Sequence, residues 1–208
     1  MTRGGVYFIF TTLRDSNGTQ SVSIDSILTS QRIIFIDDII EDKMAISVTK
    51  KILFFSIFDS DKPIKMLISS AGGSINSGFI IFDCMRSSNL HIETYCIGKA
   101  LSMASLLCAA GHKRYILPNS YMLLHEPFYH NEIKAGVSAF EAAAKNMLKI
   151  KANFDNILSE LTHQPLKTIE SFTQSDHLFY AEDAVKFGLV DEICGIDKIA
   201  EGLHYDAF

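Results

Sequence analysis

Apolar positions along the chain change repeatedly between the spacing of a strand and that of a helix. The runs Ile33–Ile36 and 64–68 are dominated by apolar residues and predict two buried strands. Between them, apolar residues recur every three or four positions over residues 44–55, which is the period of one helix face. A second apolar helix is predicted at residues 75–85. This order of elements favours an α/β fold with crossover connections.

The alternation continues through the middle of the chain. Residues 91–97 alternate like a strand, which Gly98 is expected to end. A helix of small apolar residues is predicted at residues 101–110, followed by two short strands at 114–117 and 121–124. The strand and helix units therefore repeat along one domain.

The clearest helical repeat covers residues 137–164, which no Gly or Pro interrupts. Ser138 and Glu141 match a capping box at its start. At 1.5 Å per residue this helix would be roughly 40 Å long, which is longer than a domain of this size can cover. Its lysines leave part of the surface in water, so the apolar stripe indicates burial against another subunit, with a core helix as the alternative.

Residues 1–30 differ in character from the rest of the chain. A strand is expected at residues 6–12 and a turn at residues 15–18, and mixed polar residues follow. We expect this segment to form a loop or hairpin. Residues 31–208 are expected to fold as a single domain.

The composition narrows the classes of function. The chain has 208 residues, of which 48% are hydrophobic and 21% charged, as in one globular domain. A net charge of −5 provides no basic field for nucleic acid or an anionic membrane surface. The four cysteines form no CxxC pair, so we expect reduced core thiols and no metal site. With no secretory signal pattern and no long apolar span, a cytoplasmic location is expected.

Ser102 is the first candidate for chemistry. It follows a predicted strand and begins a predicted helix, where the helix dipole favours a developing negative charge. The amide of Met103 would be one of the unpaired donors of that helix, and Gly73 in the Gly72-Gly73 pair could supply a second amide. Serine is also a common N-cap residue, and this alternative stays open at this point.

His125 is the second candidate. It follows the apolar strand predicted at residues 121–124 and precedes Glu126-Pro127, which places an imidazole at a strand end, where sites are commonly built. A surface or core histidine without a catalytic role is the alternative. The other histidines show no metal-ligand spacing.

Five segments together resemble one known family in order and spacing. They are residues 71–78, 97–103, 117–120, 124–127 and 187–191. This set is similar to the proteolytic subunit of the caseinolytic (Clp) protease, and the similarity extends over about residues 31–194. The resemblance implies a crotonase-like α/β fold with a projecting handle helix at about residues 138–161. It also implies that Ser102 is the nucleophile, that His125 is the base, and that the amides of Gly73 and Met103 form the oxyanion hole.

The sequence departs from that family at the third position of the catalytic triad. Where the family has an aspartate, this chain has Phe172, which cannot accept a hydrogen bond from an imidazole. Asp176, the hydroxyl of Thr173 or a backbone carbonyl are the possible substitutes. In related triads, losing the orienting carboxylate lowers turnover on the order of 10⁴-fold.

The resemblance implies heptameric rings stacked in pairs, fed with unfolded polypeptides by an ATP-driven AAA+ unfoldase. This chain has no P-loop signature, so no cofactor is expected in it and ATP would be used by the partner. Residues 1–30 would then form the entrance pore. Three hypotheses follow: a serine endopeptidase, a poorly active or structural subunit of a mixed ring with an active paralogue, and a crotonase-type acyl-coenzyme A enzyme.

Overall fold

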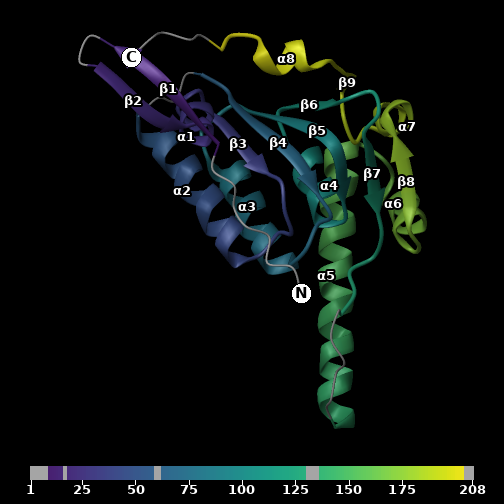
Figure 1. The fold of residues 1–208 in the computed structure, drawn as a ribbon. Coiled ribbons are helices and arrows are strands. Elements are labelled where there is room, and N and C mark those ends of the chain that lie inside the picture. The colour runs from purple at the N-terminus through teal and green to yellow at the C-terminus, as the bar shows by residue number, and fades with distance from the viewer. Residues whose placement is uncertain (1–8, 16–17, 59–61, 130–135, 204–208) are drawn as a thin grey trace.

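A mainly parallel β-sheet forms the centre of the computed structural model, which describes residues 9–15, 18–58, 62–129 and 136–203 (Figure 1). Within these residues the sheet has seven strands, in the order β3, β4, β5, β6 and β9, while β7 pairs with both β5 and β8. The strands are β3 (Ile33–Ile36), β4 (Ile64–Ser70), β5 (Ile92–Leu101), β6 (Lys113–Ile116), β7 (Tyr121–Leu124), β8 (His177–Tyr180) and β9 (Glu192–Ile193). The mixed α/β class predicted from the sequence is therefore confirmed.

Helices cover both faces of this sheet (Figure 1). They are α1 (Ile24–Ser30), α2 (Asp42–Phe58), α3 (Ile75–Ser87), α4 (Met103–Ala109), α5 (Val137–Thr162), α6 (Leu166–Thr173), α7 (Ala181–Phe187) and α8 (Ile196–Ala200). Alternate residues of each strand point to opposite faces, so Ile34 packs in a large core with α2, α3 and α4, whereas Ile33 joins a smaller cluster under α8.

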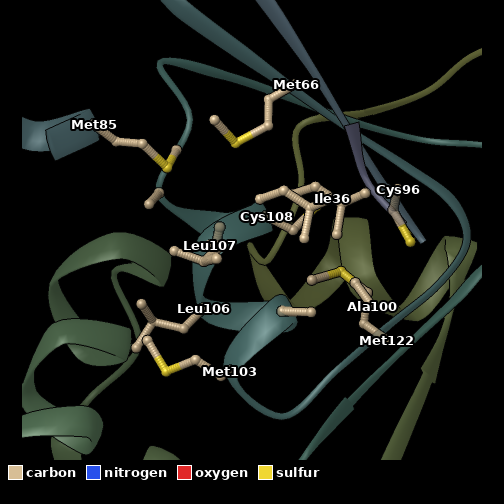
Figure 2. Close-up of a cluster of buried hydrophobic side chains, with 14 of the residues drawn as sticks. Ile36, Met66, Met85, Cys96, Ala100, Met103, Leu106, Leu107, Cys108 and Met122 are labelled. Carbon is tan, nitrogen blue, oxygen red and sulfur yellow. The ribbon is translucent and has the colours of Figure 1, made fainter. Parts of the chain in front are cut away.

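Buried sulfur atoms contribute to the large core. Figure 2 shows Met66, Met103, Cys108 and Met122 among the aliphatic side chains of this cluster. All four cysteines are free; Cys84 is half-buried and the other three are buried. Among the described residues, none of the helices is long and apolar enough to cross a bilayer.

Strand β5 is longer than the sequence predicted. Gly98 does not end it, because this glycine adopts φ +95° and the strand continues to Leu101. Before Gly98, β5 pairs with β6; after it, residues 99–101 pair with residues 121–123 of β7. We call this change of partner from β6 to β7 the fork of β5. The Gly98 amide donates to Ser120 Oγ at 2.7 Å, which stabilises the fork. The expected helix at residues 101–110 accordingly begins only at Met103.

Helix α5 extends well beyond the sheet (Figure 1). Its buried residues, Phe154, Asp155, Leu158 and Thr162, all lie in its C-terminal half. The predicted capping box is wrong, because the N-cap residue is Gly136 and no side chain caps this end. Since Ser138 is then already within the helix, its backbone lies beyond the cap position that a capping box requires.

The described part of residues 1–30 contains an antiparallel pair and a helix. Strands β1 (Phe10–Asp15) and β2 (Gly18–Ser23) pair along their full length, and α1 follows. The strand expected at residues 6–12 thus includes residues from Phe10 on, while residues 6–8 lie outside the described part. Residues 16–17 of the expected turn also lie outside it.

Candidate active site

Ser102 lies in a strained turn between β5 and α4. Its backbone has φ 57° and ψ −123°, a region that non-glycine residues rarely occupy. The Ser102 amide donates to the carbonyl of Leu123 at 2.8 Å, so β7 helps to hold this conformation. The side chain makes no capping hydrogen bond although Ser102 occupies the N-cap position. The N-cap alternative therefore does not account for this serine.

The glycine pair after β4 packs directly against this turn. Gly72 has φ +86°, and a Cβ built on it would lie 2.6 Å from the carbonyl oxygen of Leu101 and 2.9 Å from Ser102 Cβ. Gly73 has φ +151°, and a Cβ there would lie 2.4 Å from the Ile40 carbonyl oxygen. Both positions thus require glycine. The close approach of the glycine loop to the Ser102 turn and to Ile40 depends on it.

Two backbone amides at this place can donate hydrogen bonds to a negative charge. Ile40 forms a parallel bridge with Gly73, in which its amide donates to Gly72 O at 2.8 Å and its carbonyl accepts from Ser74 N at 2.7 Å. The Gly73 amide takes no part in these two bonds. The Met103 amide is in the first turn of α4, where amides have no acceptor within the helix, and it lies 3.2 Å from the Cβ position built on Gly72. Amides arranged beside a serine suit the oxyanion of acyl transfer.

The packing of the Met103 side chain holds the Met103 backbone amide in place. It is buried in the large core beside Leu106 (Figure 2). A Cβ built on Gly78 of α3 would lie 2.1 Å from Met103 Cγ, so α3 and α4 are in close contact here. The start of α4 is therefore held against α3.

His125 follows the last residue of β7, at the strand end that the sequence predicted. Its side chain is half-buried, and its ring packs against Phe128 with the centroids 5.2 Å apart. Within the described part of the chain, no hydrogen bond joins Ser102 to His125. In enzymes without substrate such a bond is often long and tightens only in the complex.

Phe172 is part of an aromatic cluster on α6, β8 and α7. Its ring lies edge-on to His177 at 4.4 Å between centroids, and at 4.9 Å and 5.7 Å from Phe187 and Phe179. The half-buried ring also packs against the large core. Position 172 therefore contributes apolar packing and no hydrogen-bond acceptor.

The two side-chain substitutes suggested by the sequence differ in their availability. Thr173 Oγ1 is buried, donates to Asp155 Oδ1 at 3.0 Å and accepts from Lys151 Nζ at 3.3 Å, so its hydroxyl is already committed. Asp176 is exposed, and the antiparallel ladder of β7 and β8 ends with Leu124 opposite His177. His125 and Asp176 are the next residues beyond this last pair, one from each strand.

Asp155 and Lys151 are not among the site residues predicted from the sequence. Asp155 is buried on α5 and accepts from Lys151 Nζ at 2.6 Å. The available signal was a carboxylate inside the apolar stripe of a helix, directly after Phe154, with a lysine four residues earlier.

A comparison with known protein families gives a match over most of the chain. The family model described as Clp protease matches residues 16–197. The matched range contains Ser102, His125, the glycine pair and the segment around Phe172. The resemblance inferred from the five sequence segments is confirmed by this match.

Proposed function

Because the chain belongs to the Clp protease family, we propose that it is a serine endopeptidase subunit of an ATP-dependent protease. In this proposal Ser102 Oγ attacks the peptide carbonyl, and His125 takes its proton and returns it to the leaving amine. The amides of Gly73 and Met103 stabilise the oxyanion, and Asp176 orients the imidazole. Water then hydrolyses the acyl-enzyme by the same route.

The conformation of Ser102 is the observation that supports this proposal best. A non-glycine residue at φ 57° is costly unless its surroundings hold it, and such strain is concentrated at functional sites. Here the serine side chain does not cap the helix that it begins. It lies instead against the positive-φ residue Gly72, directly before the first amide of α4.

We further propose the assembly and partners that the family implies. The fold would be crotonase-like with α5 as the handle helix, and subunits would form heptameric rings stacked in pairs. An AAA+ unfoldase would use ATP and deliver unfolded polypeptides through a pore formed by residues 1–30, in cytoplasmic protein quality control. The exposed apolar residues Val137, Phe140 and Leu148 on the extending part of α5 support burial against another subunit.

Phe172 supports a second candidate function, a catalytically weak or structural subunit in a mixed ring with an active paralogue. Its ring fills the aromatic cluster with His177, Phe179 and Phe187 and supplies no acceptor to His125. Without an oriented imidazole, turnover would fall on the order of 10⁴-fold. The acyl-coenzyme A hypothesis is weaker, since it requires no serine and histidine pair at this place.

Labelling with a fluorophosphonate tests the two candidates directly, because this probe reports activation of the serine. The purified full chain, Ser102→Ala and Phe172→Asp are compared by intact mass. Stoichiometric labelling of the natural sequence that Ser102→Ala abolishes would support the active peptidase. Labelling that appears only in Phe172→Asp would support the subunit that needs a paralogue, and no labelling of either would contradict a serine mechanism.

A further inference from the structure

A buried hydrogen-bond network joins the middle of α5 to the end of α6. Asp155 accepts from Lys151 Nζ at 2.6 Å and from Thr173 Oγ1 at 3.0 Å. Lys151 Nζ also donates to Thr173 Oγ1 at 3.3 Å, which closes a three-membered network. The side chain of Asp155 is 3% exposed, so both of its oxygens depend on these partners rather than on water.

This network lies close to the candidate active site. Phe154 is buried in the same core as Met103 and Leu124, the residues that flank Ser102 and His125. Lys151 lines a cavity of about 420 Å³ together with Glu126, which directly follows His125. The turn of α5 that carries Lys151 and Asp155 therefore lies near the segment that follows His125.

Asp155 is not itself suited to orient the imidazole. Lys151 offsets its charge, and its two oxygens already accept from Lys151 and Thr173. Its geometric effect is on Thr173, the last residue of α6. Three residues later Asp176 stands one step beyond the end of the β7 and β8 ladder. The short segment 174–176 is thus held at one end by this network and at the other by β8.

We propose that Asp155 is a positioning residue of the active site, which fixes Thr173 and thereby holds the carboxylate of Asp176 opposite His125. This inference rests on the proposed serine peptidase function. It assigns a role to a buried charge that packing alone does not require, since an apolar residue of similar size would fill the same volume without needing Lys151.

The test is the rate of fluorophosphonate labelling of Ser102 as a function of pH. In Asp155→Asn we expect a loss of up to about 10²-fold, the size produced by a displacement of about 1 Å in a catalytic group. We also expect the pH of half-maximal labelling to fall, because a displaced carboxylate stabilises imidazolium less. Asp176→Asn should shift the profile in the same direction and by more.

Double substitution separates positioning from a general structural effect. If Asp155 acts through Asp176, then Asp155→Asn should cause no further loss in an Asp176→Asn background. Thr173→Val should reproduce the effect of Asp155→Asn, and Thr173→Ser, which keeps the hydroxyl, should restore the natural rate. The matched control is Glu141→Gln, which removes an exposed pair with Lys145 on the same helix. It should leave the rate unchanged.

The outcomes distinguish this inference from the function on which it rests. Equal losses from Asp155→Asn in both backgrounds, or a lower melting temperature with an unchanged pH profile, would overturn the positioning role alone. So would labelling that appears only after Phe172→Asp. Absence of labelling in both the natural chain and Phe172→Asp would overturn the serine mechanism itself, and this inference with it.

Discussion

Gly72 packs so closely against Ser102 that a Cβ at position 72 would lie 2.9 Å from the Cβ of the serine. Gly72→Ala should therefore push the strained turn away from the glycine loop. We expect a loss of about 1–3 kcal/mol in the free energy of unfolding, the cost of a residue held at positive φ. The labelling of Ser102 should fall by more than this change in stability implies, because the oxyanion amides would move.

Denaturant titration and fluorophosphonate labelling measure these two effects separately. Gly202→Ala is the control, since Gly202 also has a positive φ but no atom lies within 4 Å of a Cβ built on it. Equal labelling rates in Gly72→Ala and Gly202→Ala would contradict the importance of this contact.

The exposed part of α5 predicts the behaviour of the protein in solution. Val137, Phe140 and Leu148 are 86%, 57% and 67% exposed in the single chain. Replacing Phe140 and Leu148 together by serine should reduce the size of the oligomer, because apolar side chains at this density are buried in subunit contacts. Light scattering after gel filtration gives the mass. The control is Lys145→Ser on the same helix, which should leave the mass unchanged. An unchanged mass of the double variant would place the subunit contact elsewhere.

The contacts of Arg114, which lie away from the candidate site, lead us to expect that its substitution lowers the free energy of unfolding. Its guanidinium pairs with Asp191 and donates to the carbonyls of Leu161 at 2.9 Å and Gly188 at 2.8 Å. It thus connects β6 to the end of α5 and the end of α7. Arg114→Lys cannot reproduce this planar set of donors, so we expect a loss of about 2–3 kcal/mol, the value of hydrogen bonds to charged groups.

Chemical denaturation of Arg114→Lys, with the exposed Lys186→Arg as control, measures that loss. Lys186 pairs with Glu182 at 3.8 Å on the surface, where exchange of the two cations should change little. If the two substitutions have the same effect, the carbonyl contacts of Arg114 contribute nothing.

The buried phenol of Tyr95 leads us to expect a loss of stability at alkaline pH. Burial, together with a hydrogen bond to Glu93 Oε2 at 2.7 Å, raises the pKa of this phenol above its usual value. In the unfolded chain the phenol ionises near pH 10, whereas in the folded chain it stays protonated. The folded state then binds more protons, so stability is full below pH 10 and falls above it, by about 1.4 kcal/mol per pH unit for one group.

Denaturant unfolding between pH 9 and pH 11 should show this slope, and Tyr95→Phe should reduce it. The absorbance of tyrosinate gives an independent check, because Tyr95 should titrate only when the protein unfolds. Titration of all seven tyrosines in the folded protein near pH 10 would contradict this expectation.

The elements that the sequence predicted well are those whose signal is local. Residues 121–124 were predicted as a strand with both ends correct, and Ser102 was placed between a strand and a helix, because apolar period and flanking polar residues suffice there. The end of β5 was predicted wrongly at Gly98, since the tertiary partner β7 extends the strand past a residue that usually ends one.

The parts of the candidate site that sequence reasoning missed depend on contacts between distant segments. No residue near Asp155 in the sequence indicates its hydrogen bond with Thr173, which is 18 residues away. The environment of Phe172 likewise depends on β8 and α7, which come later in the sequence. Period and motif identify residue types at their positions, but only the packed structure shows which polar groups are already committed to a partner.

The fork of β5 divides the proposed chemistry between two structural units. The proposed nucleophile and the two proposed oxyanion amides belong to the parallel part of the sheet and the start of α4, whereas His125 and Asp176 stand at the ends of β7 and β8. These two strands form one antiparallel ribbon, and a small shift of that ribbon would move base and carboxylate together. The hydrogen bond from the Ser102 amide to the Leu123 carbonyl joins these two units, so the seam between the Ser102 turn and the ribbon sets how the proposed nucleophile lies relative to the proposed base.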